Sequence, residues 1–278
     1  MSTEGDSAVM DLPAFAPGTV WLAGAGPGAP GLLTLLAARG LAEADLILHD
    51  ALVSDAVLAL AGPGATLAFV GKRAGVPSPK QPEITARMVA AARAGLKVLR
   101  LKGGDPFTFA RGAEEALALA AAGVPFRVVP GVSAGVGGLG WAGVPITHRA
   151  VGSAVTFISG RCATGALPEG LNWRALSLGA PTLVLFMALG TLPAIAHRLM
   201  AGGRSPGEAV VIVSNATLTT QSVLETTLAA AERDAAGLCV PSPAIVAVGQ
   251  GAAEARRAVL PFLLNGRGEG QCPAQKPG

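Results

Sequence analysis

The sequence predicts an α/β protein whose parallel sheet is covered by helices on both faces. In the first half of the chain, short apolar and β-branched runs alternate with longer alanine-rich stretches. Continuous apolar strands separated by helices of about 10–15 residues are typical of parallel sheets, because crossover helices bury both faces. The predicted strands are residues 19–24, 46–49, 67–70, 97–101 and 126–129, and the predicted helices are residues 32–41, 51–60, 82–94 and 111–122.

A glycine-rich stretch, residues 131–143, interrupts this alternation and is the predicted boundary between two domains. Beyond it the alternation resumes, with strands expected at 154–159, 182–187, 209–214 and 244–248 and helices at 192–201 and around 226–236. We therefore expect a disordered N-terminus over residues 1–17, an N-terminal α/β domain over 18–131, a C-terminal α/β domain over 132–266 and a disordered tail over 267–278.

The composition excludes a disordered protein and argues against a membrane span. Hydrophobic residues make up 51% of the 278 residues and charged residues 14%, against about 25% charged in an average soluble protein. The two longest uncharged stretches, residues 128–147 and 175–196, are both interrupted by glycine and proline. A spanning helix needs about 20 apolar residues with its backbone satisfied internally, so we expect no membrane segment.

The N-terminal segment and the cysteines predict a cytoplasmic protein. Residues 1–17 contain Glu4, Asp6 and Asp11 and no basic residue, whereas signal and transit peptides require positive charge. The three cysteines are far apart and in no metal-ligand spacing, so we expect reduced thiols. The three histidines are too scattered to indicate a metal site.

Basic residues are concentrated in one part of the chain, which suggests an anionic partner. Residues 72–111 contain nine basic residues against two acidic ones. A solvated helix accounts for Arg87 and Arg93 but not for Arg100 and Lys102, which lie in an apolar run. Aromatic residues make up 4% of the chain and tyrosine is absent, so stacking platforms for nucleic acid are scarce and we expect no nucleic-acid partner.

Two glycine-rich turns follow predicted strands. The first, residues 24–31, contains Gly26-x-Gly28-x-x-Gly31, which matches the dinucleotide fingerprint, with Asp50 about 20 residues further on. Pro27 and Pro30 each remove a backbone N–H that would hold a pyrophosphate, so this turn suits a ligand that is less anionic. A tight turn without any ligand is the alternative.

The second glycine turn, residues 102–107, follows the fourth predicted strand. Ligands of open α/β sheets bind at the carboxyl ends of the strands, so two such turns predict a crevice there. The pair Asp105-Pro106 is equally typical of the start of a helix.

Six motifs in order carry a resemblance to a known family. They are residues 20–28 (VWLAGAGPG), 50–54 (DALVS), 70–73 (VGKR), 101–107 (LKGGDPF), 129–134 (VPGVSA) and 145–149 (PITHR). In this order they resemble the tetrapyrrole methylase family over roughly residues 19–250. The resemblance implies two α/β domains with the active site in the cleft between them, S-adenosylmethionine as methyl donor without a metal, a homodimer, and C-methylation of uroporphyrinogen III to precorrin-2 on the path to cobalamin or sirohaem.

The resemblance also implies which residues act. Asp50 is implied as proton acceptor and Lys72 as proton donor; without the family, the alternatives are a helix N-cap for Asp50 and a solvated charge for Lys72. Arg111 and Arg149 are expected to hold substrate carboxylates. The implied cofactor contacts are Pro27, Gly103, Gly104, Asp105, Thr108, Ser133, Ala134 and Met187, with Ala216 and Ala244 from the second domain.

Three other functions remain as alternatives. A methyltransferase acting on a later cobalamin precursor would share the whole site. An NAD(P)-dependent oxidoreductase would rest on the first glycine turn and Asp50. An anion- or RNA-binding module would use residues 72–111.

Overall fold

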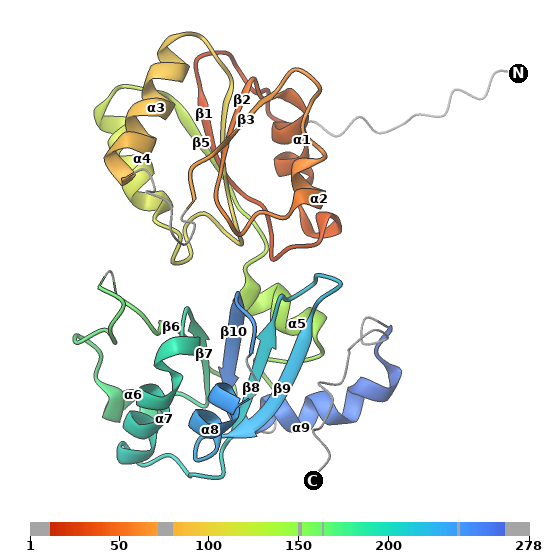
Figure 1. Cartoon of the computed structure of the whole chain (residues 1–278), viewed down its shortest axis with the longest axis vertical. Helices are drawn as coiled ribbons and strands as arrows, with labels where there is room; N and C mark the ends of the chain where they lie inside the picture. Colours follow the sequence, from red (N-terminus) through yellow and green to blue (C-terminus); the bar gives the residue numbers. More distant parts are fainter. Residues whose placement is uncertain (1–11, 72–79, 150–151, 163, 238–239, 265–278) are drawn as a thin grey trace, which may run out of the picture.

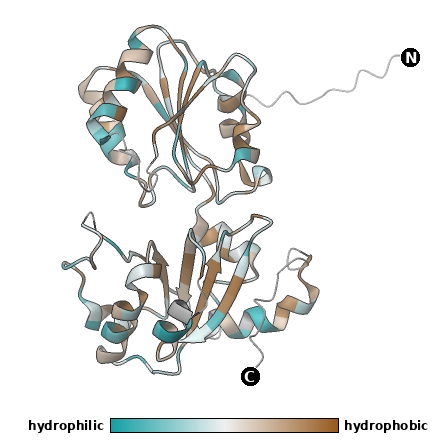
Figure 2. Cartoon of the chain, in the orientation of Figure 1, coloured by the Kyte–Doolittle hydropathy of each residue, from teal (hydrophilic) through white to brown (hydrophobic). Residues whose placement is uncertain are grey.

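The computed structural model describes residues 12–71, 80–149, 152–162, 164–237 and 240–264. In these residues the strands form two five-stranded sheets, one from each half of the chain, and helices pack on both faces of each sheet (Figure 1). The strands are largely hydrophobic, and polar residues gather on the helices (Figure 2). The expected mixed α/β architecture is therefore present in both halves. No helix in the described ranges is long and apolar enough to cross a membrane.

The first sheet is entirely parallel, with strand order β3-β2-β4-β1-β5. Its strands match the predicted ranges to within one residue, and the expected helices are also present. The strands are β1 (Val20–Gly24), β2 (Leu46–His49), β3 (Thr66–Phe69), β4 (Val98–Lys102) and β5 (Phe126–Val129); the helices are a 3₁₀ turn (Pro30–Leu32), α1 (Leu35–Glu43), α2 (Asp55–Leu58), α3 (Gln81–Arg93) and α4 (Gly112–Ala121).

The strand order of this sheet separates it from dinucleotide-binding folds. In those folds the order is 3-2-1-4-5-6, so strands one and two are neighbours. Here β4 lies between β2 and β1. The fingerprint-like glycines after β1 thus stand in a different sheet, which removes the main structural support for the oxidoreductase alternative.

The second sheet is mixed, with strand order β6-β7-β10-β8-β9. Of the neighbouring strands in this sheet, β6 and β7 pair in parallel. Strand β10 pairs antiparallel with both β7 and β8, and β9 pairs antiparallel with β8. Its strands are β6 (Val155–Ser159), β7 (Thr182–Phe186), β8 (Ala209–Ser214), β9 (Ser222–Thr227) and β10 (Ala244–Val248); its helices are a π-helix (Ala134–Gly138), α5 (Leu139–Trp141), α6 (Trp173–Gly179), 3₁₀ turns at Leu189–Thr191 and Leu260–Phe262, α7 (Leu192–Ala201), α8 (Ala231–Gly237) and α9 (Gln250–Val259).

The sequence analysis missed β9, α6 and α9, and it placed the start of α8 too early. Strand β9 reads Ser-Val-Leu-Glu-Thr-Thr and lies at the edge of the sheet, so it lacks the continuous apolar run of a central strand. The glycine-rich stretch 131–143 is not a loop but contains the π-helix and α5, which connect the two sheets (Figure 1).

Four buried clusters hold the layers together. In the first sheet, one cluster packs against α1 and α2 and the other against α3 and α4; in the second, one packs against α6, α7 and α8 and the other against α5 and α9. Phe15 lies in the segment expected to be disordered, yet it is buried and stacks on Trp21 with ring centroids 4.2 Å apart. Burial of this ring places it in the core, so the order of the chain begins before residue 18.

Candidate active site

The two sheets present facing edges on which most of the predicted site residues lie. All five strands of the first sheet end at one edge, which carries the turns after β1, β2, β4 and β5. The second edge carries the ends of β6, β7 and β8 and the start of β10, where Met187, Ala216 and Ala244 lie. We call these the first edge and the second edge.

Side chains and backbone connect the two edges directly. The Ala29 N–H, in the turn after β1, donates a hydrogen bond of 2.9 Å to the Thr217 hydroxyl after β8. The rings of Phe109 and Phe186 lie 4.9 Å apart between centroids. The predicted cofactor residues Pro27, Ala134 and Ala216 surround one point, because a Cβ built on Gly138 would lie 3.8, 3.5 and 3.0 Å from their respective Cβ atoms.

The two glycine turns of the first edge are bonded to each other. Gly26 and Gly104 exchange backbone hydrogen bonds of 3.2 and 2.7 Å. A Cβ on Gly24 would lie 2.4 Å from the Gly104 carbonyl oxygen, so this close approach requires glycine. Among the residues that the structure describes, a Cβ on Gly104 itself would meet only Ser133 and Ala134, each at 4.0 Å. The turn therefore borders unfilled space beside two residues that were predicted to contact the cofactor.

Asp105 fixes the second glycine turn. One carboxylate oxygen accepts the Gly131 N–H at 3.0 Å, and the other accepts the Phe107 N–H at 2.9 Å and the Thr108 hydroxyl at 3.2 Å. Both oxygens are thus engaged inside the protein. Asp105 and Thr108 shape the turn. Gly103 packs against Leu52, where a Cβ would lie 2.5 Å from the Leu52 Cβ, so the open space lies at the Cα of Gly104.

Asp50 follows β2 at the first edge and is not a helix cap. Its Oδ1 accepts the Leu52 N–H at 3.0 Å, and its Oδ2 lies 4.0 Å from the Arg100 guanidinium. Helix α2 begins later than expected because Ser54 caps it: the Ser54 hydroxyl accepts the Val57 N–H and donates to the Gly28 carbonyl. The N-cap alternative for Asp50 is therefore wrong. Lys72 lies outside the described residues.

Arg100 and Lys102 are buried, which corrects their expected place in a basic surface. Both pair with Glu115 of α4, at 3.0 Å each. Burial and the nearby Arg100 lower the pKa of Lys102, against the effect of Glu115. Burial alone would raise the pKa of Glu115, but Arg100 and Lys102 hold it below its ordinary value. These two cations cannot bind an external anion.

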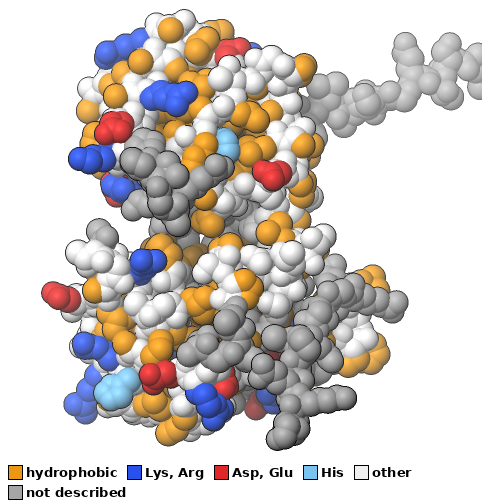
Figure 3. All heavy atoms as spheres, in the orientation of Figure 1, with side chains coloured by type: hydrophobic (Ala, Val, Ile, Leu, Met, Phe, Trp, Pro, Cys, Tyr) orange, Lys and Arg blue, Asp and Glu red, His pale blue; other side chains and the backbone are white. Residues whose placement is uncertain are grey.

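The remaining basic side chains are spread over the surface. On the face shown in Figure 3, lysines and arginines are dispersed over both halves of the molecule. Arg111 is exposed but paired with Glu114, which raises the pKa of Arg111. Arg149 is exposed at the end of the PITHR motif and has no ionic partner within the described ranges.

Strained backbone marks both edges, and three of the residues that carry it, Phe109, Asn215 and Thr217, were not singled out by the sequence analysis. Among the residues that the structure describes, five other than glycine have positive φ: Phe109, Arg111, Met187, Asn215 and Thr217. All five follow strands that end at the two edges, and such strained backbone concentrates at functional sites. The sequence carries no signal for this strain, because aromatic and β-branched residues disfavour positive φ.

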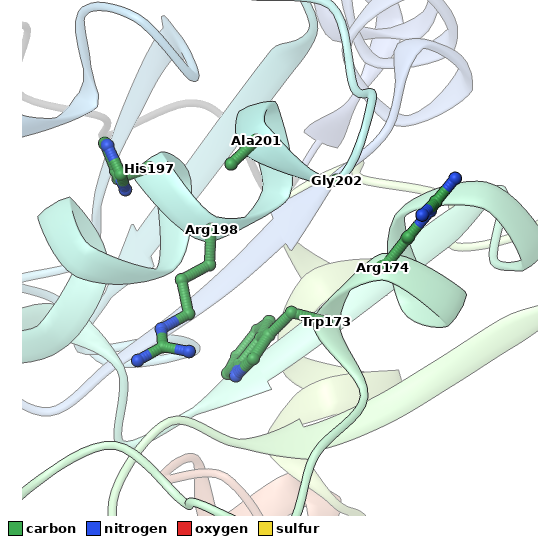
Figure 4. A pocket seen from close by; sticks show the side chains of 6 residues that line it. All are labelled: Trp173, Arg174, His197, Arg198, Ala201 and Gly202. Atoms are coloured by element: carbon green, nitrogen blue, oxygen red, sulfur yellow. The ribbon is translucent and has the colours of Figure 1, made fainter.

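A separate hollow of about 410 Å³ lies between α6 and α7 (Figure 4). It is lined by Trp173, Arg174, His197, Arg198, Ala201 and Gly202. None of the predicted site residues lines it, and it lies on the helical layer rather than at the strand ends. It is therefore no part of the candidate site.

Comparisons with known proteins agree with this arrangement. Residues 19–232 match the family of Tetrapyrrole (Corrin/Porphyrin) Methylases. A uroporphyrinogen-III C-methyltransferase of Sinorhizobium sp is 56% identical over 245 residues, 88% of each chain. A siroheme synthase of Photorhabdus laumondii is 44% identical over 233 residues; the match covers 84% of this chain and 49% of that protein, so this chain spans about half of its length.

A solved structure has the same fold. The uroporphyrin-III C-methyl transferase of Thermus thermophilus, in complex with S-adenyl homocysteine, superposes with a TM-score of 0.74 at 39% identity, covering 85% of this chain and 99% of that one. An α/β chain with two sheets and glycine turns at facing edges is the class that the fold defines. This chain belongs to the tetrapyrrole methylase family.

Proposed function

We propose that this protein is an S-adenosylmethionine-dependent methyltransferase that adds two methyl groups to carbon atoms of uroporphyrinogen III, giving precorrin-2. The observation that carries the proposal is the assembly of the family's motif residues at the two facing edges, in a chain 56% identical to a protein named for this activity. The product feeds the biosynthesis of cobalamin or sirohaem.

The residues present fit S-adenosylmethionine. The open space beside Gly104, bounded by Ser133 and Ala134, is a cradle that a Cβ would fill. Backbone groups of Gly103 and Gly104 lie on one side of it, and the small residues Ala216 and Ala244 with Met187 lie on the second edge. A ligand with adenine, ribose and amino-acid ends suits such a wall of backbone and small side chains. We propose these residues, with Pro27, Asp105 and Thr108, as the cofactor site.

Proton transfer falls to the first edge. The cofactor supplies an electrophilic sulfonium methyl group, which an electron-rich pyrrole carbon attacks as S-adenosylhomocysteine leaves. The methylated macrocycle must then lose a proton, and Asp50 is the proposed acceptor; its half-buried carboxylate at the strand end supports this role. Lys72, in the VGKR motif, is the proposed proton donor. Holding the donor methyl and the acceptor carbon in line contributes the rest of the rate.

The substrate side of the proposal rests on charge. Uroporphyrinogen III carries eight carboxylates, and Arg149 is an exposed cation with no ionic partner among the described residues. Arg111 contributes if it exchanges Glu114 for a substrate carboxylate. We also propose that residues 18–131 and 132–266 are two domains with the site in the cleft between them, and that the protein is a cytoplasmic homodimer.

Mass spectrometry of the product tests the function. Purified protein is incubated with anaerobically prepared uroporphyrinogen III and S-adenosylmethionine, and the oxidised product is weighed. The proposal expects a gain of two methyl groups. If uroporphyrinogen III is recovered unmodified while a later cobalamin precursor is methylated, the proposal is wrong about the substrate, and the later precursor takes its place.

A further inference from the structure

A buried cluster of charged residues lies directly behind Asp50. Arg100 and Lys102 alternate along β4, so both side chains point to the face that α3 and α4 cover. Their exposed fractions are 4% and 2%, and Glu115 of α4 is fully buried. Three charged groups inside a face that is otherwise apolar require an explanation.

Glu115 fixes the cluster. Its Oε1 accepts hydrogen bonds from Arg100 Nε at 3.0 Å and from the Gln81 amide at 2.9 Å, and its Oε2 accepts one from Lys102 at 3.0 Å. A terminal nitrogen of Arg100 donates to the carbonyls of Leu48 and Leu101 at 3.2 and 3.1 Å. The guanidinium is therefore held on three sides. Its other terminal nitrogen faces Asp50 Oδ2 at 4.0 Å.

The charges of the cluster do not balance without Asp50. Arg100 and Lys102 share the single carboxylate of Glu115, which leaves one positive charge in a buried position. Asp50 is the further carboxylate that pairs with it among the described residues. The Asp50 side chain is 24% exposed and that of Arg100 is 5% exposed. Arg100 therefore lies in the interior, and Asp50 lies at the surface of the proposed site.

Stability does not explain this arrangement. Replacing a buried ion triad by apolar residues of similar volume is often neutral or stabilising. The neighbouring positions of β4 are apolar and pack in the core without difficulty. A buried cation aimed at the carboxylate that is proposed to accept the proton is instead the arrangement expected of a group that orients a reacting side chain.

We infer that Arg100, anchored by Glu115, is a positioning residue that holds the Asp50 carboxylate in its reactive orientation. The Leu52 N–H holds Oδ1 and Arg100 attracts Oδ2, so both oxygens are fixed from the protein side while the carboxylate stays open to the site. This inference rests on the proposed function of Asp50. It adds the group that keeps Asp50 in place.

A double-mutant cycle tests the inference. Arg100→Met leaves Lys102 and Glu115 as a balanced pair, so the chain is expected to fold. Turnover should fall about 10- to 100-fold, with the KM for uroporphyrinogen III and the affinity for S-adenosylhomocysteine within about twofold. Arg100→Lys, which keeps the charge, should restore part of the turnover and serves as the second variant if Arg100→Met does not fold. In an Asp50→Asn background, either change should have no further effect.

A matched control removes a bond of the same cluster without touching the pair. Gln81→Met deletes one hydrogen bond to Glu115 and should lower the melting temperature while leaving turnover unchanged. The inference is overturned if Arg100→Met turns over at the wild-type rate, or if its loss is equally large with Asp50 and with Asn at position 50.

A second measurement does not need activity. The carboxyl ¹³C resonance of Asp50, identified by its absence in Asp50→Asn, should move in Arg100→Met and stay in place in Gln81→Met. If the wild type fails to methylate uroporphyrinogen III, the proposed function fails, and this resonance alone decides the positioning role. A resonance that does not move in Arg100→Met overturns it.

Discussion

In the first sheet all five strands are parallel, so their carboxyl ends deliver two glycine turns, Asp50 and Asp105 to one edge. In the second sheet only three strands end at the facing edge, and the antiparallel β10 begins there, which brings alanines and Met187 instead. Parallel topology concentrates polar and charged turn residues at one place, whereas the mixed sheet supplies small and apolar ones. The proposed proton transfer uses groups of the first edge, and the proposed cofactor site uses residues of both edges.

The largest effect is expected for Asp50→Asn, which tests whether proton transfer belongs to the first edge. Asn can still accept the Leu52 N–H, but it removes the charge that faces the buried Arg100, so the variant should fold and melt at a lower temperature. It cannot accept a proton, so turnover should fall by roughly 10²–10⁴. Steady-state kinetics, a thermal melt and calorimetry with S-adenosylhomocysteine measure the three quantities. Native turnover in the folded variant would place the base elsewhere.

The second test concerns the cofactor on the first edge. Gly104→Ala places a methyl group in the open space of the turn and should weaken S-adenosylhomocysteine binding by at least about tenfold. Gly123→Ala is the matched control: φ is 68° there against 69° at Gly104, and no atom of the described residues lies within 4 Å of the new Cβ. Both variants carry the same backbone strain of about 1–2 kcal/mol. Equal affinities in the two would remove this turn from the site.

The third test breaks the bond between the edges. Thr217→Val keeps the shape of the side chain but cannot accept the Ala29 N–H. Leaving that donor unpaired costs about 1 kcal/mol, which corresponds to about fivefold in affinity for S-adenosylhomocysteine if the cofactor needs both edges. Thr217→Ser keeps the hydroxyl and should bind as the wild type does. Weakened binding in both variants would point to a packing effect of the methyl group.

The smallest expected effect is that of substrate charge. Arg149→Ala should raise the KM for uroporphyrinogen III about threefold with little change in turnover, as expected for one exposed charge pair. Added salt should weaken wild-type binding, because such pairs are screened over about 8 Å at physiological ionic strength. Arg174→Ala, an exposed arginine at the hollow of Figure 4, is the control and should leave the KM unchanged.

Much of the first sheet could be predicted from sequence, because each strand is a short apolar run bounded by glycine, proline or aspartate. In the second sheet, strands β6, β7, β8 and β10 were also predicted to within one residue. Their directions were not predicted, because the antiparallel strand β10 is as apolar as a parallel one, and the edge strand β9 was missed because it is half polar. The predicted site residues were identified from the six motifs that resemble the family. The partners that hold them were not: the sequence shows Arg100 in an apolar run without indicating that Glu115 pairs with it, and Thr217 contacts Ala29 across 188 residues of sequence.

A crystal structure of the protein with S-adenosylhomocysteine tests the central claim most directly. The account predicts the ligand between the two edges, with its atoms against the backbone of Gly103 and Gly104 on one side and against Met187 and Ala216 on the other. Asp50 should then face the space next to the ligand sulfur, where the macrocycle enters. A ligand bound to one edge alone, or in the hollow between α6 and α7, would contradict the account.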